Sequence, residues 1–311
     1  MLNILVTGGA GYIGSILVPQ LLGFGHKVTV VDNLYYNQNS LLDVCANENF
    51  SFVRGDARDK ETMAREILGK DVIIPLACLV GAPLCKEQPL EATSINFDAI
   101  ELIMSLRSED QKIIFPTTNS GYGVGQEGIF CTEETPLNPI SLYGRLKTDI
   151  EQELLESKNT ITLRLATVFG SSPRMRIDLL VNDFVYRAIN DRSLVLFEAH
   201  FKRNFIHIRD VANAFIHCID NFETMKNEAY NVGLSDANLS KMELCELIKE
   251  QLPNLEIIEA ELGEDPDKRN YIVSNEKIEK TGFRPQHSLV MGISELIKTF
   301  SIIKRNSYGN I

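Results

Sequence analysis

Short apolar runs and longer amphipathic segments alternate along the first half of the chain. Runs rich in β-branched residues predict strands, whereas apolar residues three or four apart predict helices. The expected strands are 3–7, 27–31, 51–54, 71–75, 112–115 and 161–165, and the expected helices are 12–23, 60–68, 89–106 and 141–157. This strand-helix-strand rhythm predicts a parallel sheet covered by helices on both faces, with right-handed crossovers.

The alternation breaks after Gly170, where residues 171–176 form an irregular basic segment. Asp210 is the expected N-cap of a later helix, and Ser240 with Glu243 predicts a capping box at another. Beyond the break the pattern predicts helices over 179–189, 209–219, 241–251 and 291–303, and strands over 194–197 and 229–232.

These elements predict an α/β fold: a Rossmann-type doubly wound parallel sheet with a smaller α/β substrate-binding lobe. We expect the core to span 1–170, with 204–233 returning to it. The lobe then consists of 171–203 and 234–311. Chemistry is expected in the cleft between the two parts, because parallel sheets bind ligands where strand order reverses.

Composition fits this picture and excludes several classes of function. The 311 residues are 44% hydrophobic and 23% charged, as in an ordinary globular protein, with a net charge of −11. Such an acidic chain is not expected to bind nucleic acid or anionic membranes broadly. The six cysteines form no C-x-x-C pair, so we expect free thiols and no zinc site. We read no secretory leader and no spanning segment, and therefore expect a cytoplasmic protein.

A glycine-rich turn is the first candidate for chemistry. Gly8, Gly11 and Gly14 follow a predicted strand and open a predicted helix. Glycines in this context let backbone amides at a helix N-terminus approach a dinucleotide pyrophosphate. Asp32 ends the second strand, where a carboxylate accepts bonds from ribose hydroxyls and favours NAD over NADP. The expected cofactor contacts are Gly8, Gly11, Tyr12, Ile13, Gly14, Asp32, Asn33, Asp56, Ala57, Leu76, Ala77 and Asn96, with Tyr143 and Lys147.

Tyr143 and Lys147 form the second candidate. Residues four apart lie on one face of a helix, and an ammonium there favours the phenolate of a tyrosine whose ordinary pKa is about 10. Upstream, the strand ending in Thr117 and Thr118 is rich in hydroxyl groups. Together with the glycine turn, these residues indicate proton-coupled hydride transfer with a nicotinamide cofactor.

With these motifs the chain resembles an extended short-chain dehydrogenase/reductase of the nucleotide-sugar epimerase/dehydratase group. Residues 7–14 match its T-G-G-A-G-x-I-G turn, and 139–147 match its P-x-S-x-Y-G-x-S-K region with Leu146 in place of a small residue. Residues 164–170 and 204–210 match later segments. The resemblance implies tightly bound NAD(H), with Thr118 as catalytic hydroxyl, Tyr143 as base and Lys147 as its helper.

Departures from the family narrow the expected reaction. The 4,6-dehydratases of this family carry an Asp-Glu pair after the catalytic threonine, where Asn119 and Ser120 stand here. The glutamate of the decarboxylases and the cysteine of the 3,5-epimerase/reductases are also missing. Oxidation at C4 of a sugar remains, with the ketone either kept or reduced again from the opposite face by a 4-epimerase.

Three stretches resemble a narrower branch that acts on nucleotide-activated heptoses: 119–125, 173–183 and 263–271. They imply C4 oxidation of a GDP-linked manno-heptose for surface-polysaccharide synthesis. The resemblance further implies a nucleotide-diphosphate sugar as substrate and a homodimer, or dimer of dimers, paired through helices 89–106 and 141–157. The implied substrate contacts are Asn119, Arg174, Asn182, Arg203 and Arg269.

Two other functions stay open on the sequence alone. One is a dehydrogenase of a small alcohol or lignin-like ketone, against which the second lobe and its arginines argue. The other is an NAD(H)-sensing regulator without turnover, which has no need of Thr118, Tyr143 and Lys147.

Overall fold

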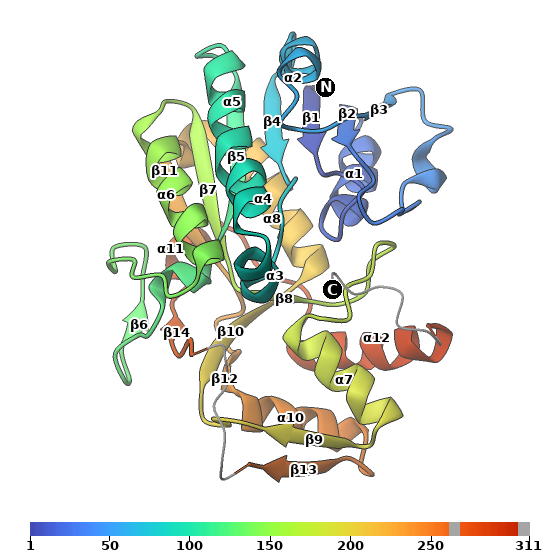
Figure 1. Ribbon diagram of the computed structural model, residues 1–311, viewed down its shortest axis with the longest axis vertical. Helices are drawn as coiled ribbons and strands as arrows, with labels where there is room; N and C mark the ends of the chain where they lie inside the picture. The colour runs from blue at the N-terminus through green and yellow to red at the C-terminus, as the bar shows by residue number, and fades with distance from the viewer. Residues whose placement is uncertain (261–267, 304–311) are drawn as a thin grey trace.

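The computed structural model describes residues 1–260 and 268–303. A seven-stranded sheet forms its centre, and every neighbouring pair of strands is parallel (Figure 1). Strand order is β11-β7-β5-β4-β1-β2-β3, so chain order reverses between β1 and β4, as in Rossmann-type sheets. The strands are β1 Asn3–Thr7, β2 Lys27–Asp32, β3 Phe50–Arg54, β4 Val72–Pro75, β5 Lys112–Thr118, β7 Thr160–Leu165 and β11 Glu228–Val232.

Helices cover both faces of this sheet, as predicted. Side chains of a strand alternate between its faces, so Ile4 and Val6 pack in one apolar cluster and Leu5 in another. The first cluster lies under α1 and α8, and the second under α2, α5 and α6. The helices are α1 Gly14–Gly23, α2 Lys60–Ile67, α5 Ala99–Leu106, α6 Leu142–Glu156 and α8 Ile208–Asp220.

The predicted helix over 89–106 is interrupted. It consists of α4 (Pro89–Thr93), a π-helical turn (Ser94–Asp98) and α5. The sequence did not predict a further helix, α3 (Ala82–Glu87), which lies directly before α4.

Most elements after residue 170 form a second, smaller part below the sheet (Figure 1), whereas α8 and β11 return to the sheet. Ser240 and Glu243 make the expected capping box at α10. Asp210 was wrong as an N-cap, because α8 begins after His207 and the Asp210 carboxylate instead accepts bonds from Gln286 and His287. The helices here are α7 Leu180–Asn190, α10 Lys241–Gln251 and α12 Leu289–Ile302, while α9 Phe222–Met225 packs beside α8 and α11 Glu276–Lys280 packs beside β11.

Short strands link the two parts. β10 pairs with β8 on one side and β12 on the other, while β13 pairs with β9 and β14 with β6. Their bounds are β6 Phe130–Cys131, β8 Thr167–Phe169, β9 Ser193–Leu196, β10 Lys202–His207, β12 Asn238–Ser240, β13 Glu256–Glu259 and β14 Ile272–Val273. Of the heptose-like stretch 263–271, residues 263–267 lie outside the described residues.

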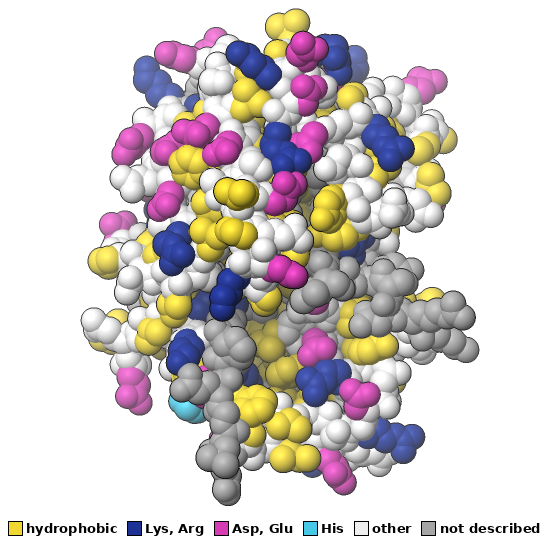
Figure 2. Space-filling model, viewed as in Figure 1, with side chains coloured by type: hydrophobic (Ala, Val, Ile, Leu, Met, Phe, Trp, Pro, Cys, Tyr) yellow, Lys and Arg dark blue, Asp and Glu magenta, His cyan; other side chains and the backbone are white. Residues whose placement is uncertain are grey.

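The surface is mixed in charge. Lys and Arg side chains are scattered among Asp and Glu on the face shown in Figure 2. Within residues 1–260 and 268–303, no helix has both the length and the apolar character needed to cross a bilayer. All six cysteines are free thiols, as expected.

Candidate active site

The glycine turn between β1 and α1 has the shape that a dinucleotide requires. Gly8 has a φ of +67°, and a Cβ added to it would lie 2.5 Å from the backbone nitrogen of Ala77. A Cβ on Gly14 would lie 2.4 Å from the carbonyl oxygen of Gly9. Glycine is therefore required at both positions, as in a turn that brings a helix N-terminus close to a pyrophosphate. Gly11 closes the turn by donating to the carbonyl of Gly8 at 3.0 Å.

Asp32 lies beside this turn at the end of β2. Its side chain is buried and accepts bonds from the amides of Ala10 at 3.0 Å and Leu34 at 2.8 Å. Burial raises the pKa of Asp32, and these two amide bonds pull it down. The Gln38 side chain, missed from the sequence, also donates to this carboxylate at 3.2 Å. The carboxylate is thus oriented next to the turn, where a cofactor ribose would lie.

Asn33 and Asp56 meet at the same edge of the sheet, with buried Ala57 next to them. Asp56, however, accepts two bonds from the Arg58 guanidinium, at 2.8 and 2.6 Å, which hold the pKa of its carboxyl below the ordinary range. Arg58 also donates to Glu91 at 2.9 Å. A role of Asp56 toward adenine therefore has to be shared with its ion pair.

Asn96 binds the backbone of the segment that follows β4. It is buried in the π-helical turn, where its amide accepts from the Leu79 nitrogen at 2.8 Å and donates to the Leu79 oxygen at 2.9 Å. It thereby holds the irregular backbone of the segment that follows Leu76 and Ala77 after β4. These contacts make Asn96 a positioning residue for the segment after β4, where cofactor contacts are predicted at Leu76 and Ala77.

The catalytic candidates come together where β5 ends and α6 begins. Ser141 caps α6 through the Gly144 amide, which places Tyr143 and Lys147 on its first turns. Lys147 is buried, donates to the carbonyl of Pro116 at 3.1 Å and lies 4.2 Å from the centroid of the Phe115 ring. The strand end that carries Thr118 is thereby attached to the helix that carries Tyr143.

The charge state of Tyr143 differs from the expectation. Burial raises the pKa of Tyr143 above its ordinary value, the Cys78 and Cys85 thiols add to this, and the cations of Arg176 and Arg269 oppose it. The pKa of Tyr143 therefore lies above its ordinary value, whereas the sequence predicted a value lowered toward neutral pH. The physical reason is that the loss of water around the phenol outweighs the nearby positive charge.

Arg176 consequently becomes a testable contributor to the base. Because a raised pKa keeps the proton on Tyr143 at neutral pH, kcat/KM should increase as the pH rises toward the pKa of the phenol. Arg176→Met removes a positive charge, so it should displace the rising limb to higher pH and reduce kcat/KM several-fold at pH 7. Arg176→Lys keeps the charge and should retain the profile. Superimposable profiles for the Met variant and the unmodified protein would show that this cation does not act on Tyr143.

Residues 170–176 lie across the start of α1. Tyr12 donates to the Gly170 carbonyl at 2.6 Å, and the hydroxyls of Ser15 and Ser172 are 2.7 Å apart. Asn182 is fully buried, donates to Tyr12 and to the Arg176 carbonyl, and accepts from the Gly170 amide. Asn182 thus holds this segment on the cofactor turn, and its predicted substrate contact stays a prediction.

Arg174 also contacts the cofactor side. Its guanidinium carbon lies 4.5 Å from the centroid of the Tyr36 ring, in the loop that follows Asp32. Its backbone nitrogen donates to the Ser15 hydroxyl at 3.4 Å. Arg174 therefore lies beside the glycine turn and the loop after Asp32, and its predicted substrate contact stays a prediction. The sequence did not point to Tyr36, because its contact with Arg174 joins distant segments of the chain.

Arg203 and Arg269 lie on adjoining segments at the other side of the site. Arg203 is buried in β10, with its guanidinium carbon 5.6 Å from the ring centroid of Tyr271. Arg269 donates to the hydroxyl of Ser120, and Ser120 contacts Thr118. Asn119, between the two hydroxyl residues, is 1% exposed, and neither polar atom of its amide has a hydrogen-bond partner. A buried amide in this condition calls for a partner, either an ordered water or a ligand.

A buried network supports the catalytic strand end from behind. Thr117 donates to Glu151 at 2.6 Å, and Glu151 forms an ion pair with Arg164 at 2.7 Å. Arg164 donates in turn to the Tyr122 hydroxyl at 3.1 Å, which donates to Asn231 at 2.7 Å. The network ties β5, α6, β7 and β11 together directly behind Thr118.

His207 belongs to a second buried cluster, which is structural. Its ring nitrogen lies 3.0 Å from Glu295, and Glu295 also accepts from the Ser171 backbone at 3.1 Å. The His207 ring stacks on His287 with centroids 4.5 Å apart. The cluster joins α12 to the segment after β8, which gives His207 a packing role.

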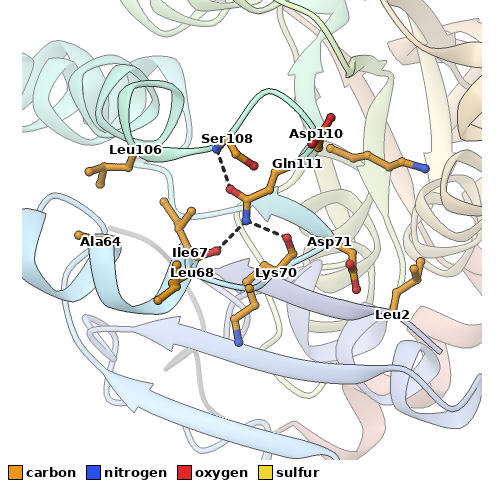
Figure 3. A pocket seen from close by; sticks show the side chains of 12 residues that line it. Leu2, Ala64, Ile67, Leu68, Lys70, Asp71, Leu106, Ser108, Asp110 and Gln111 are labelled. Carbon is orange, nitrogen blue, oxygen red and sulfur yellow. Dashed lines mark hydrogen bonds between the residues drawn. The ribbon is translucent and has the colours of Figure 1, made fainter.

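One surface hollow lies far from all of these residues. It lies at the amino ends of β1, β4 and β5, opposite the glycine turn, and is lined by residues such as Leu2, Lys70 and Gln111 (Figure 3). The Gln111 amide there donates to the carbonyls of Ile67 and Lys70 and accepts from the Ser108 amide. Its polar groups are satisfied within the protein, so the hollow offers no candidate chemistry. Among the residues that the structure describes, no cluster of His, Cys, Asp and Glu has the arrangement of a metal site.

Comparison with known proteins agrees with this geometry. The family described as "NAD dependent epimerase/dehydratase family" matches residues 4–233. The chain is 29% identical to a putative UDP-glucose 4-epimerase of Methanocaldococcus jannaschii, over 94% of this chain and 97% of that protein. It is 27% identical to the low-salt glycan biosynthesis protein Agl12 of Haloferax volcanii, over 95% and 97%.

Solved structures agree in fold and in family. A UDP-glucose 4-epimerase of Thermotoga maritima with UDP-glucose shares 25% identity, with a TM-score of 0.84 over 97% of this chain and 99% of that chain. DesIV, a dTDP-glucose 4,6-dehydratase of Streptomyces venezuelae with NAD bound, shares 25% identity and a TM-score of 0.84 over 97% of each chain. This chain therefore belongs to the NAD-dependent epimerase/dehydratase family, the extended short-chain dehydrogenase/reductases that act on nucleotide-linked sugars with NAD as cofactor.

Proposed function

We propose that the protein oxidises C4 of a nucleotide-linked sugar of the GDP-manno-heptose type and yields the 4-keto sugar for surface-polysaccharide synthesis. The arrangement that carries this proposal is the association of Thr118, Tyr143 and Lys147 at the end of β5, next to the glycine turn. The resemblance of residues 119–125 and 173–183 to heptose-specific enzymes supports the choice of sugar.

The side chains divide the work as follows. Tyr143 takes the proton of the C4 hydroxyl, and Thr118 donates a hydrogen bond to the oxygen as it becomes a ketone. Lys147 holds the strand end and the helix together through Pro116, and its ammonium adds positive charge to the site. Gly8, Gly11 and Gly14 would hold NAD, which when bound would supply the hydride acceptor for C4 and a positive charge that favours the Tyr143 phenolate.

Asn119 and Ser120 separate this reaction from dehydration. Elimination of water needs an acid and a base beside the ketone, as the Asp-Glu pair of the dehydratases provides. The Asn119 amide and the Ser120 hydroxyl do not supply such an acid and base. The two unpartnered polar atoms of Asn119 suit a hydrogen bond to a sugar oxygen, so we propose that it binds substrate.

A nucleotide-sugar 4-epimerase is the second candidate, and the relatives described as UDP-glucose 4-epimerases favour it. Both reactions begin with the same oxidation. An epimerase then lets the ketone turn over in the site before it is reduced on the opposite face. The two differ in whether reduced cofactor accumulates as product forms.

A panel of GDP- and UDP-linked hexoses and heptoses tests the proposal. Products are identified by mass spectrometry and NMR, and reduced nicotinamide is followed by absorbance. We expect a heptose product that has lost two hydrogens, together with one equivalent of NADH. An inverted product without net NADH would identify the epimerase. Both candidates would be contradicted if the NAD-loaded protein converted none of the nucleotide sugars. Turnover of a simple alcohol in place of a nucleotide sugar would contradict them as well.

We also propose the arrangement in which this site operates. Residues 1–170 with 204–233 form the NAD-binding core, and 171–203 with 234–311 form the substrate-binding lobe of a cytoplasmic enzyme that retains its NAD(H). The outward faces of α4 to α5 and of α6 pair in a homodimer, for which the 86% exposed Leu90 on α4 offers an apolar contact. Light scattering on the purified protein tests the dimer.

A further inference from the structure

A chain of hydrogen bonds connects the two ends of the proposed substrate site. Thr118 donates from its hydroxyl to that of Ser120 at 2.8 Å, and the Ser120 amide donates back to Thr118 at 3.1 Å. The Arg269 guanidinium donates to the same Ser120 hydroxyl. Ser120 is 2% exposed, so water does not replace these partners. The buried Ser120 hydroxyl thus links Arg269, a predicted substrate contact, to Thr118, the proposed catalytic hydroxyl.

The backbone fixes this connection. Gly125 donates to the Asn270 carbonyl at 2.8 Å, and Asn270 donates to the Gly123 carbonyl at 3.3 Å. On its other side the segment is tied to β10, since the Asn270 side chain accepts from the Lys202 amide at 2.9 Å. Asn270, next to Arg269, is therefore bonded on one side to residues 123–125, which follow Ser120, and on the other to β10, which carries Arg203.

The direction of these bonds matters for catalysis. A hydroxyl oxygen accepts at most two hydrogen bonds. In Ser120 the two acceptor positions receive Thr118 and Arg269, so the Ser120 hydrogen points elsewhere and the Thr118 hydrogen is held on Ser120. In this state Thr118 has no hydrogen to donate to a sugar oxygen.

We infer that Ser120 is a positioning residue that couples diphosphate binding to the orientation of Thr118. A diphosphate competes for Arg269, because bonds between guanidinium and phosphate are charge-assisted on both sides. Ser120, released from Arg269, can turn and donate to Thr118, and the Thr118 hydrogen then points to the C4 oxygen. The inference rests on the proposed function, and it makes the nucleotide diphosphate a condition for rapid oxidation as well as for binding.

Substrate truncation tests this coupling. The unmodified protein should oxidise the nucleotide sugar with a much higher kcat than the same sugar as a plain methyl glycoside without phosphate. Ser120→Ala removes the hydroxyl that holds the Thr118 hydrogen, so this variant should narrow the kcat ratio between the two substrates by about tenfold. The KM for the methyl glycoside should stay as it is, since that substrate has no diphosphate to bind.

Three variants separate coupling from a structural effect. Ser120→Thr keeps a hydroxyl and should retain the original kcat ratio. Ser105→Ala, at an exposed position of α5, should not alter the ratio either. Arg269→Met should narrow the ratio as Ser120→Ala does, and the double variant should add nothing further. An unchanged ratio in Ser120→Ala, or additive effects in the double variant, would overturn the inference. Failure of the unmodified protein to oxidise any nucleotide sugar would instead overturn the proposed function.

Discussion

Tyr143→Phe is expected to lower kcat on the order of a thousandfold, because the variant keeps the ring but has no group to take the C4 proton. The ring packs against the apolar cluster around Leu79 and Leu146, which phenylalanine can also fill. Folding and cofactor binding should therefore persist. The measurement is single-turnover oxidation of the accepted nucleotide sugar, together with the NAD content of the protein after gel filtration.

Tyr186→Phe on α7 is the matched control. That ring makes an edge contact with Phe300, and the substitution removes an equivalent hydroxyl away from the site. It should leave the rate and the NAD content as they are. If Tyr143→Phe retained most of the turnover while Tyr186→Phe did the same, another group would have to be the base.

Glu151→Ala should lower the free energy of unfolding by about 3–5 kcal/mol, since it leaves a buried guanidinium without its partner. The side chains of Arg164 and Glu151 are only 7% and 3% exposed. Thr117 loses its acceptor in the same variant. The change also loosens the strand end that carries Thr118, so kcat should decrease at temperatures at which the variant is still folded.

Urea unfolding at a fixed NAD concentration measures this effect, because bound cofactor stabilises the folded state. Glu156→Ala on the exposed side of α6 is the control and should change the free energy of unfolding by less than about 0.5 kcal/mol. Replacing both partners, as in Glu151→Leu with Arg164→Met, should recover part of the loss. A cost for Glu151→Ala no larger than that of the control would show that the pair is not a buried constraint.

The fold was largely predictable because its pattern is local. Strand β1 is a short apolar run, strand β7 alternates polar with apolar residues, and the capping box of Ser240 lies within four consecutive residues. The π-helical turn around Asn96 was not predictable, because its apolar spacing is that of an ordinary helix. Strands β6 and β14 are too short to show any period, and they exist because their partners lie across the site.

The candidate site was predictable only where one segment carries it. Gly8, Gly14, Tyr143 and Lys147 are recognisable from spacing. The contacts of Ser120 with Arg269, and of Arg174 with Tyr36, join residues from distant segments that meet only in the folded chain. Asp210 was misplaced for the same reason, since its partner His287 comes from the C-terminal part. The raised pKa of Tyr143 depends on burial, which a helical spacing does not measure.

The central claim is that the protein removes hydride from C4 and leaves every oxygen of the sugar in place. Its most direct test uses the accepted nucleotide sugar with deuterium at C4, compared in one experiment with unlabelled substrate and with substrate labelled at C5. A primary isotope effect on kcat/KM for the C4 label alone, with a product that retains all its oxygens, is the predicted result. Equal rates for the C4-labelled and unlabelled substrates together with a product that has lost water would contradict the account.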